Sequence, residues 1–120
     1  MLDYVEFFKA ISDKTRLRIM GLLARMDREL CVCQIMAALG ESQYKISRHL
    51  KILKMSGWLK ERKEGRWVYM SIAENNNPLV IQILRALKLL PDQYIELAIP
   101  LNEISKVSMK DTCSTSCNKK

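Results

Sequence analysis

The sequence predicts a mainly α-helical protein with a β-hairpin wing, a winged helix-turn-helix that is homodimeric. Three observations predict it. Two stretches with helical apolar periodicity, residues 32–39 and 43–55, are separated only by a short turn that contains Gly40. Two strand-like stretches joined by a glycine-containing turn follow them within residues 58–72. Most of the excess positive charge lies on the second helix and these strands.

Length and charge limit the kind of protein this can be. A chain of 120 residues is most simply one domain with a modest core, which dimerisation would enlarge. The formal net charge is +7, and residues 42–70 alone carry eight basic and two acidic side chains, a net charge of +6. Because neutralising phosphates releases counterions, such a local cationic surface favours nucleic acid over membrane.

The first two predicted helices cover residues 2–11 and 14–25. The apolar stripe of the first consists of Leu2, Val5, Phe8 and Ile11. The second follows Asp13, a residue type that caps helix N-termini. Its apolar residues supply much of the expected core: Leu17, Ile19, Met20, Leu22, Leu23 and Ala24. Residues 29–31 are then either a short strand or the lead-in to the next helix.

The helix-turn-helix spans residues 32–55. Gly40 follows the last apolar residue of its first helix as a C-cap, and Ser42 is placed to cap the second helix. The second helix turns Ile46, Leu50 and Leu53 inward and leaves a polar, basic face, which this motif presents to the DNA major groove. The predicted DNA contacts on it are Gln43, Tyr44, Ser47, Arg48, His49 and Lys51. For His49 the alternative is a satisfied polar residue on the flank of the helix.

Two strands, residues 58–62 and 67–72, are predicted from alternating β-branched and aromatic residues. The four residues between them contain Gly65 and form the expected hairpin turn. Arg62, Lys63 and Arg66 make this tip basic and are predicted to contact DNA phosphates, which supply affinity more than sequence choice.

The last predicted helix runs from Pro78 to Leu90, after the N-cap Asn77. It is apolar nearly all round, and a small monomer cannot bury such a surface, so it indicates a dimer interface. From residue 105 the sequence becomes polar. We therefore expect a DNA-binding and dimerisation domain over residues 1–104 and a flexible, cysteine-containing tail over residues 105–120.

The cysteines indicate a ligand site. The sequence shows neither a secretory signal nor a spanning segment, so we expect a cytoplasmic protein with no membrane partner, in which disulfides are disfavoured. The four cysteines are then metal or metalloid ligands, redox sensors or packing residues: Cys31, Cys33, Cys113 and Cys117. Since His49 is the only histidine, and no phosphate loop is present, we expect no enzyme.

The spacing of Cys31 and Cys33 suggests a switch. Positions i and i+2 of an ideal helix point about 200° apart, so we expect that both sulfurs can bind one ion only after the helix start unwinds. A cysteine at a helix N-terminus is also expected to have a lowered pKa. Thiolates favour soft ions over Mg²⁺ or Ca²⁺.

The segments TRLRIMGLL, ELCVCQI and SQYKISRHLKILKMSGWLKERKEGRWVYMSI resemble the ArsR/SmtB family of metal-responsive winged-helix repressors, over residues 4–90. The resemblance implies a homodimer, built from the first and last helices, that binds palindromic double-stranded operator DNA. It also implies that an inducer lowers the affinity for DNA and derepresses a resistance operon.

The subtype follows from the ligands that the resemblance implies. ELCVC is similar to the site of arsenic-responsive repressors, where As(III) or Sb(III) is bound by three cysteines, but Met36 stands at the third position. Cys113 or Cys117 can supply the missing sulfur. The alternative is Cd(II) or Pb(II) bound by all four cysteines. The histidine-containing zinc and nickel site of the last helix is absent. A thiol redox regulator and an architectural DNA-binding protein without an effector are the remaining alternatives.

Overall fold

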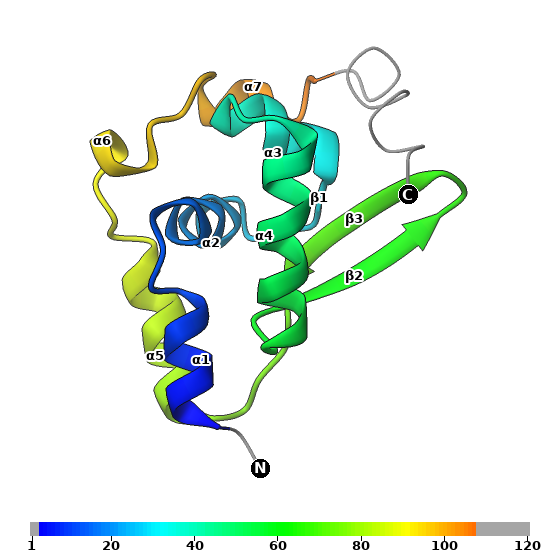
Figure 1. Cartoon of the computed structure of the whole chain (residues 1–120). Helices are drawn as coiled ribbons and strands as arrows, with labels where there is room; N and C mark the ends of the chain where they lie inside the picture. Colours follow the sequence, from blue (N-terminus) through cyan, green and yellow to red (C-terminus); the bar gives the residue numbers. More distant parts are fainter. Residues whose placement is uncertain (1–2, 108–120) are drawn as a thin grey trace.

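The computed structural model describes residues 3–107. Its elements, in order, are α1 (Tyr4–Ala10), α2 (Lys14–Met26), β1 (Leu30–Cys31), α3 (Val32–Leu39), α4 (Gln43–Met55), β2 (Leu59–Glu64), β3 (Trp67–Ile72), α5 (Pro78–Leu87), α6 (Asp92–Ile95) and α7 (Leu101–Ile104). Helices surround α2, and the hairpin of β2 and β3 projects from the helical body as a wing (Figure 1). The predicted winged helix-turn-helix fold is confirmed.

Local sequence signals explain where the helices begin. The Asp13 carboxylate accepts the backbone N–H of Arg16 at 3.1 Å and caps α2. The Ser42 hydroxyl oxygen accepts the N–H of Lys45 at 3.2 Å and caps α4. Gly40 ends α3 with a φ of 66°, in the left-handed region that favours glycine. The predicted caps at Asp13, Gly40 and Ser42 are therefore confirmed.

The wing is one part of a three-stranded antiparallel sheet with the order β1-β3-β2. Residues 30 and 31 pair with β3, so the segment before the helix-turn-helix is a strand and not a lead-in to α3. The predicted four-residue hairpin turn is wrong. β2 continues to Glu64, which pairs with Trp67, so the turn consists of Gly65 and Arg66. The φ of 59° at Gly65 suits the first central residue of a two-residue type II′ turn.

The apolar stripe predicted for the first helix is wrong in register. The structure buries Phe7 at 2% exposure, whereas Val5 and Phe8 are 63% and 40% exposed. Phe7 stacks on the buried Trp58 with ring centroids 3.8 Å apart, and the indole Nε1–H donates to the Phe7 carbonyl oxygen at 2.8 Å. The stacking and this hydrogen bond select Phe7 over Phe8.

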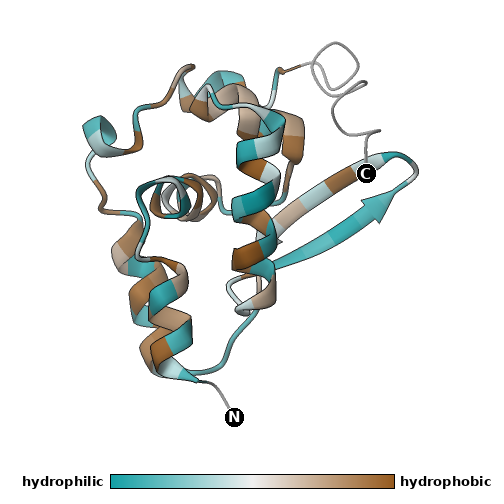
Figure 2. Cartoon of the chain, in the orientation of Figure 1, coloured by the Kyte–Doolittle hydropathy of each residue, from teal (hydrophilic) through white to brown (hydrophobic). Residues whose placement is uncertain are grey.

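Helices α1 and α5 keep exposed apolar side chains. On and just after α5, Leu79 is 46% and Leu89 82% exposed. The two helices adjoin where the Asn77 amide donates to the Tyr4 hydroxyl oxygen at 2.6 Å. Figure 2 shows apolar residues along both. α5 ends at Leu87, three residues earlier than predicted.

The predicted boundary between domain and tail stays a prediction. α7 ends at Ile104. Of the predicted tail, residues 105–107 are described, and Cys113 and Cys117 lie outside the described residues. No helix within residues 3–107 is long and apolar enough to span a lipid bilayer.

Candidate functional site

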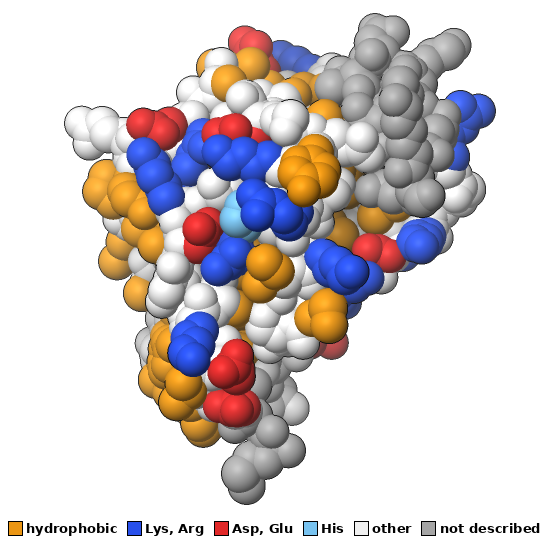
Figure 3. All heavy atoms as spheres, in the orientation of Figure 1, with side chains coloured by type: hydrophobic (Ala, Val, Ile, Leu, Met, Phe, Trp, Pro, Cys, Tyr) orange, Lys and Arg blue, Asp and Glu red, His pale blue; other side chains and the backbone are white. Residues whose placement is uncertain are grey.

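The polar face of α4 forms a basic surface. Tyr44 is 78% exposed, and Arg48 and Lys51 are also exposed, while Gln43 and Ser47 are half-buried. The Arg48 guanidinium carbon lies 5.8 Å from the centre of the Tyr44 ring. Figure 3 shows Lys and Arg side chains gathered over α4 and continuing toward the wing. Five of the six residues predicted on this helix therefore reach one surface.

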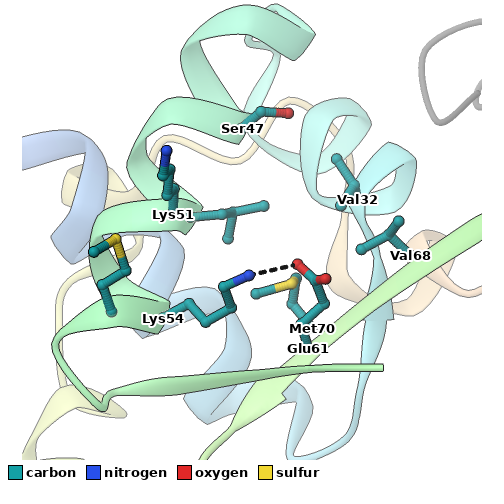
Figure 4. A pocket seen from close by; sticks show the side chains of 9 residues that line it. Val32, Ser47, Lys51, Lys54, Glu61, Val68 and Met70 are labelled. Atoms are coloured by element: carbon teal, nitrogen blue, oxygen red, sulfur yellow. Dashed lines mark hydrogen bonds and ion pairs between the residues drawn. The ribbon is translucent and has the colours of Figure 1, made fainter. Parts of the chain in front are cut away.

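A hollow of about 280 Å³ separates α4 from the wing. Its lining is mainly apolar, with Ser47, Lys51, Lys54 and Glu61 as its polar members. The Lys54 ammonium and the Glu61 carboxylate, 3.3 Å apart, form an ion pair across it (Figure 4). Because the hollow interrupts close packing, the wing and α4 are joined less tightly than elements of the core.

On the wing, Arg62 is engaged within the protein. Its Nε and Nη2 donate to the two carboxylate oxygens of Glu29 at 2.9 and 2.6 Å. Its Nη1 donates to Glu64 at 2.5 Å, and its guanidinium carbon lies 4.5 Å from the centre of the Tyr69 ring. The hydrogen bonds from Arg62 hold the pKa of Glu29 below its ordinary value.

The other two predicted phosphate contacts of the wing are exposed. The Lys63 ammonium is 3.7 Å from the Glu61 carboxylate. The Arg66 guanidinium carbon is 5.8 Å from the Trp67 ring centre. Both charges lie near the hairpin turn, where they can reach a polyanion without leaving a buried position.

His49 does not share the exposed surface of α4. It is 6% exposed, and its Nδ1 lies 3.0 Å from Nη1 of Arg16 and 3.7 Å from the Asp13 carboxylate. Burial lowers the pKa of His49, the charges of Arg16, Arg48 and Lys45 lower it further, and Asp13 opposes them. The ring therefore joins α4 to the start of α2 and lies outside the exposed face of α4.

Burial of His49, together with the charges of Arg16, Arg48 and Lys45, makes stability depend on pH. The unfolded ring titrates near pH 6.5 and the folded ring at lower pH, so between these values the unfolded state binds more protons. We expect the free energy of unfolding to fall as the pH drops below about 6.5, by at most about 1.4 kcal/mol per pH unit from this group. Urea unfolding of the wild type and of His49→Gln between pH 7.5 and 5 measures this. Equal pH slopes in the two proteins would contradict it.

The two cysteines of β1 and α3 face each other. Cys31 is the N-cap residue of α3, with an extended backbone at φ −67° and ψ 147°, and its Sγ lies 2.9 Å from the Sγ of Cys33. Both residues are 0% exposed. The expectation that the helix start must unwind to bring them together is wrong, because Cys31 lies outside the helix and is not subject to helical spacing.

The expected low pKa of Cys31 is also wrong. Burial raises the pKa of the Cys31 thiol, and it outweighs the backbone N–H groups of Cys33, Val68, Gln34 and Val32, which lower it. The Gln34 side chain accepts the backbone N–H of Cys31 at 2.9 Å, in the manner of a capping box. The helix N-terminus therefore acts on this sulfur, but desolvation is the larger effect.

The cysteine pair is the part of the predicted ligand set that is described. Within residues 3–107, no three His, Cys, Asp or Glu side chains form a group that could hold a metal ion. Cys31 and Cys33 are the only two of the four predicted ligands in this range, and their converging sulfurs suit a soft ion.

Arg18, on α2, is a buried residue that apolar periodicity did not reveal. It is 5% exposed. Its Nη1 donates to the Glu41 carboxylate at 2.8 Å and its Nη2 to the Leu39 carbonyl oxygen at 2.9 Å, while its Nε donates to the Ile95 carbonyl oxygen at 2.6 Å. Arg18 thus holds the turn between α3 and α4 in place. Its position within the apolar run LRIMGLLA was the available signal.

Comparison with known proteins identifies the family. The profile described as bacterial regulatory protein, arsR family, matches residues 13–60. An arsenic resistance transcriptional regulator of Pseudomonas putida is 49% identical over 69 residues, which are 58% of this chain and 59% of that protein. An uncharacterised HTH-type transcriptional regulator of Methanocaldococcus jannaschii is 43% identical over 79 residues, 66% of this chain and 88% of that protein.

The fold is also similar to that of a solved structure. Reduced HlyU from Vibrio cholerae has a TM-score of 0.60 and 30% identity, with 72% of this chain and 90% of that chain covered. The match to the Pseudomonas putida regulator spans less than two thirds of that relative. The family profile and both named relatives are those of regulators rather than enzymes, as the sequence predicted. The chain therefore belongs to the arsR family of bacterial regulatory proteins.

Proposed function

We propose that this protein is a metalloid-responsive transcriptional repressor. It binds operator DNA as a homodimer and leaves the operator when As(III) or Sb(III) binds its cysteine thiolates, which derepresses a resistance operon. The observation that carries the proposal is the 2.9 Å separation of the Cys31 and Cys33 sulfurs at the start of α3, because α3 leads through the Gly40 turn into the basic helix α4. The similarity to an arsenic resistance regulator supports it.

In this proposal α4 reads the major groove. Arg48 and Lys51, with Tyr44, Gln43 and Ser47, contact bases and phosphates. Lys63 and Arg66 bind phosphate beside the groove, and Arg62 joins them when phosphate displaces a carboxylate. His49 supports α4 from within, through Arg16.

The exposed apolar side chains of α1 and α5 bind a second copy of the chain. A two-fold dimer presents two copies of α4, and these must match half-sites about one DNA turn apart. A small displacement of α4 in each subunit therefore weakens binding to a palindromic operator. A cytoplasmic location fits this function, because the cytoplasm keeps the cysteines reduced.

The inducer changes the spacing of the cysteine pair. Two sulfurs that each bond to one ion, at a distance near the zinc–thiolate bond of about 2.3 Å, would lie farther apart than the 2.9 Å found here. Binding therefore pushes Cys31 and Cys33 apart at the junction of β1 and α3. Cys113 or Cys117 supplies the third sulfur for As(III) or Sb(III). A Cd(II) or Pb(II) site would use all four.

Release from DNA tests the proposal. Fluorescence anisotropy of the reduced protein on its promoter fragment, at fixed salt, is followed during titration with arsenite, antimonite, Cd(II), Pb(II) and Zn(II). We expect release by arsenite and antimonite at low micromolar concentrations, because three soft thiolates bind these ions strongly. Release by Cd(II) or Pb(II) alone would support the four-cysteine alternative. No release by any of the five would refute a metal response.

Separate Cys113→Ser and Cys117→Ser variants distinguish the two ligand sets, since a three-sulfur site tolerates loss of one tail cysteine and a four-sulfur site does not. The close approach of Cys31 and Cys33 also favours a second candidate, a redox regulator. Release by peroxide without metal would support that candidate. DNA binding that neither metals nor peroxide change would instead indicate an architectural protein.

A further inference from the structure

One row of residues crosses the sheet from the cysteine pair to the wing. Cys31 on β1 pairs with Tyr69 on β3, and Tyr69 pairs with Arg62 on β2. Directly paired residues project from the same face of a sheet. The Arg62 guanidinium over the Tyr69 ring, 4.5 Å from its centre, agrees with this. The row therefore joins the buried sulfur of Cys31 to an exposed cation of the wing.

Arg62 is also connected to the segment of Cys31 through Glu29. Glu29 lies two residues before Cys31 and receives two hydrogen bonds from Arg62, at 2.9 and 2.6 Å. A two-pronged contact between guanidinium and carboxylate fixes orientation as well as distance, unlike a contact of a flexible ammonium. Arg62 also binds Glu64, but Glu64 belongs to β2 itself, so that contact links the wing only to itself.

We propose that Glu29 and Arg62 are positioning residues that transmit the state of the cysteine pair to the wing. The inference rests on the proposed function, in which an inducer separates the sulfurs of Cys31 and Cys33. A shift of Cys31 moves the short strand that contains it, and Glu29 moves with that strand. Arg62 follows Glu29, and the wing turns with it.

The hollow beside the wing makes this movement feasible. Its volume of about 280 Å³ lies between α4 and the strands β2 and β3, and the Lys54–Glu61 ion pair crosses it. A shift of the wing there stretches this half-exposed ion pair and meets less close packing than a shift in the core would. The inducer then acts on DNA affinity in two ways, through α3 and α4 and through the wing. Loss of the second route should weaken the response without abolishing inducer binding.

The test compares Glu29→Gln with Glu64→Gln. Each variant removes one negative charge beside Arg62, but only Glu29 adjoins the strand β1, which contains Cys31. We measure operator affinity by anisotropy with and without saturating arsenite, and take the ratio of the two dissociation constants. Without arsenite, the affinities of the two variants should agree within about threefold, because they carry the same charge change. With arsenite, the ratio should be about 2- to 30-fold smaller in Glu29→Gln than in the wild type, and unchanged in Glu64→Gln.

Inducer binding is measured separately, by the ultraviolet absorbance of the arsenic–thiolate bonds. Glu29→Gln should bind arsenite with the wild-type stoichiometry. The ratio of its arsenite dissociation constants on and off DNA should shrink by the same factor as the ratio of its operator dissociation constants with and without arsenite, as linkage requires. A merely structural role of Glu29 would change thermal stability but neither ratio. If arsenite released the wild type and the ratio of operator dissociation constants in Glu29→Gln equalled that of the wild type, the link between the cysteine pair and the wing would be refuted, whereas the proposed function would stand. If no thiol-binding ion released the wild type, the proposed function would fall as well.

Discussion

Replacing Cys31 by serine is expected to abolish release from the operator by arsenite, while the folded protein and its operator affinity persist. The hydroxyl is a hard ligand and a poor substitute for a soft thiolate. Because loss of a supporting residue alone weakens metal sites 10- to 100-fold, loss of a direct ligand should weaken arsenite binding by roughly 100-fold or more. Stability should persist because Cys31 is the N-cap of α3, and serine is a favoured residue there.

Arsenite titrations of the wild type and of Cys31→Ser, followed by anisotropy and by thiolate absorbance, measure this effect. Cys33→Ala is the companion variant. It removes the other sulfur, and alanine is chosen because Cys33 is buried inside α3, where a serine hydroxyl would have no capping role. Unfolding curves of all three proteins supply the control for stability. Wild-type release by arsenite in Cys31→Ser would show that the inducer site lies elsewhere.

Replacing Arg18 by leucine should cost about 3–5 kcal/mol of unfolding free energy, the cost of breaking a buried ion pair by removing one partner. The side chains of Arg18 and Glu41 are 6% and 23% exposed. Leucine would leave the Glu41 carboxylate with only the half-exposed Lys45 ammonium, 3.3 Å away, and the carbonyl oxygens of Leu39 and Ile95 without the Arg18 donor. Loss of this magnitude is a large part of the stability of a small domain.

Urea unfolding at fixed protein concentration measures the effect, with Lys14→Gln as the control on the same helix. Lys14 pairs with Glu96 at 3.4 Å, and both side chains are more than half exposed, so its loss should cost less than about 1 kcal/mol. Equal losses in the two variants would mean that burial of Arg18 adds nothing to stability. Operator binding by the Arg18→Leu protein under stabilising conditions then reports whether the turn before α4 is still positioned.

Local signals predicted most of the fold. Asp13, Gly40 and Ser42 mark the ends of helices through their own side-chain or backbone properties, and the structure places each cap where the sequence predicted it. The turn of the wing was predicted too long because strand pairing extends β2 to Glu64. Pairing is a property of two strands, and neither strand alone reveals it.

The candidate site was predicted less completely, because burial decides its chemistry. The sequence left His49 open between a DNA contact and a satisfied polar residue, and left Arg18 unnoticed. Both side chains are buried and bind partners 33 and 23 positions away. Likewise, Cys31 and Cys33 were identified by their spacing, whereas the approach of their sulfurs and the raised pKa of Cys31 depend on the pairing of β1 with β3 and on desolvation.

The sequence by itself therefore determined the winged helix-turn-helix, the basic helix that suits DNA and the identity of the cysteine pair. Periodicity, capping and charge act over a few neighbouring residues, so they can be read along the chain. Only the tertiary structure decided which aromatic residue of α1 is buried, which polar residues hold α4 in place, and that Glu29 pairs with Arg62 of the wing. These depend on contacts between residues distant in sequence, whose energies come from desolvation and close packing.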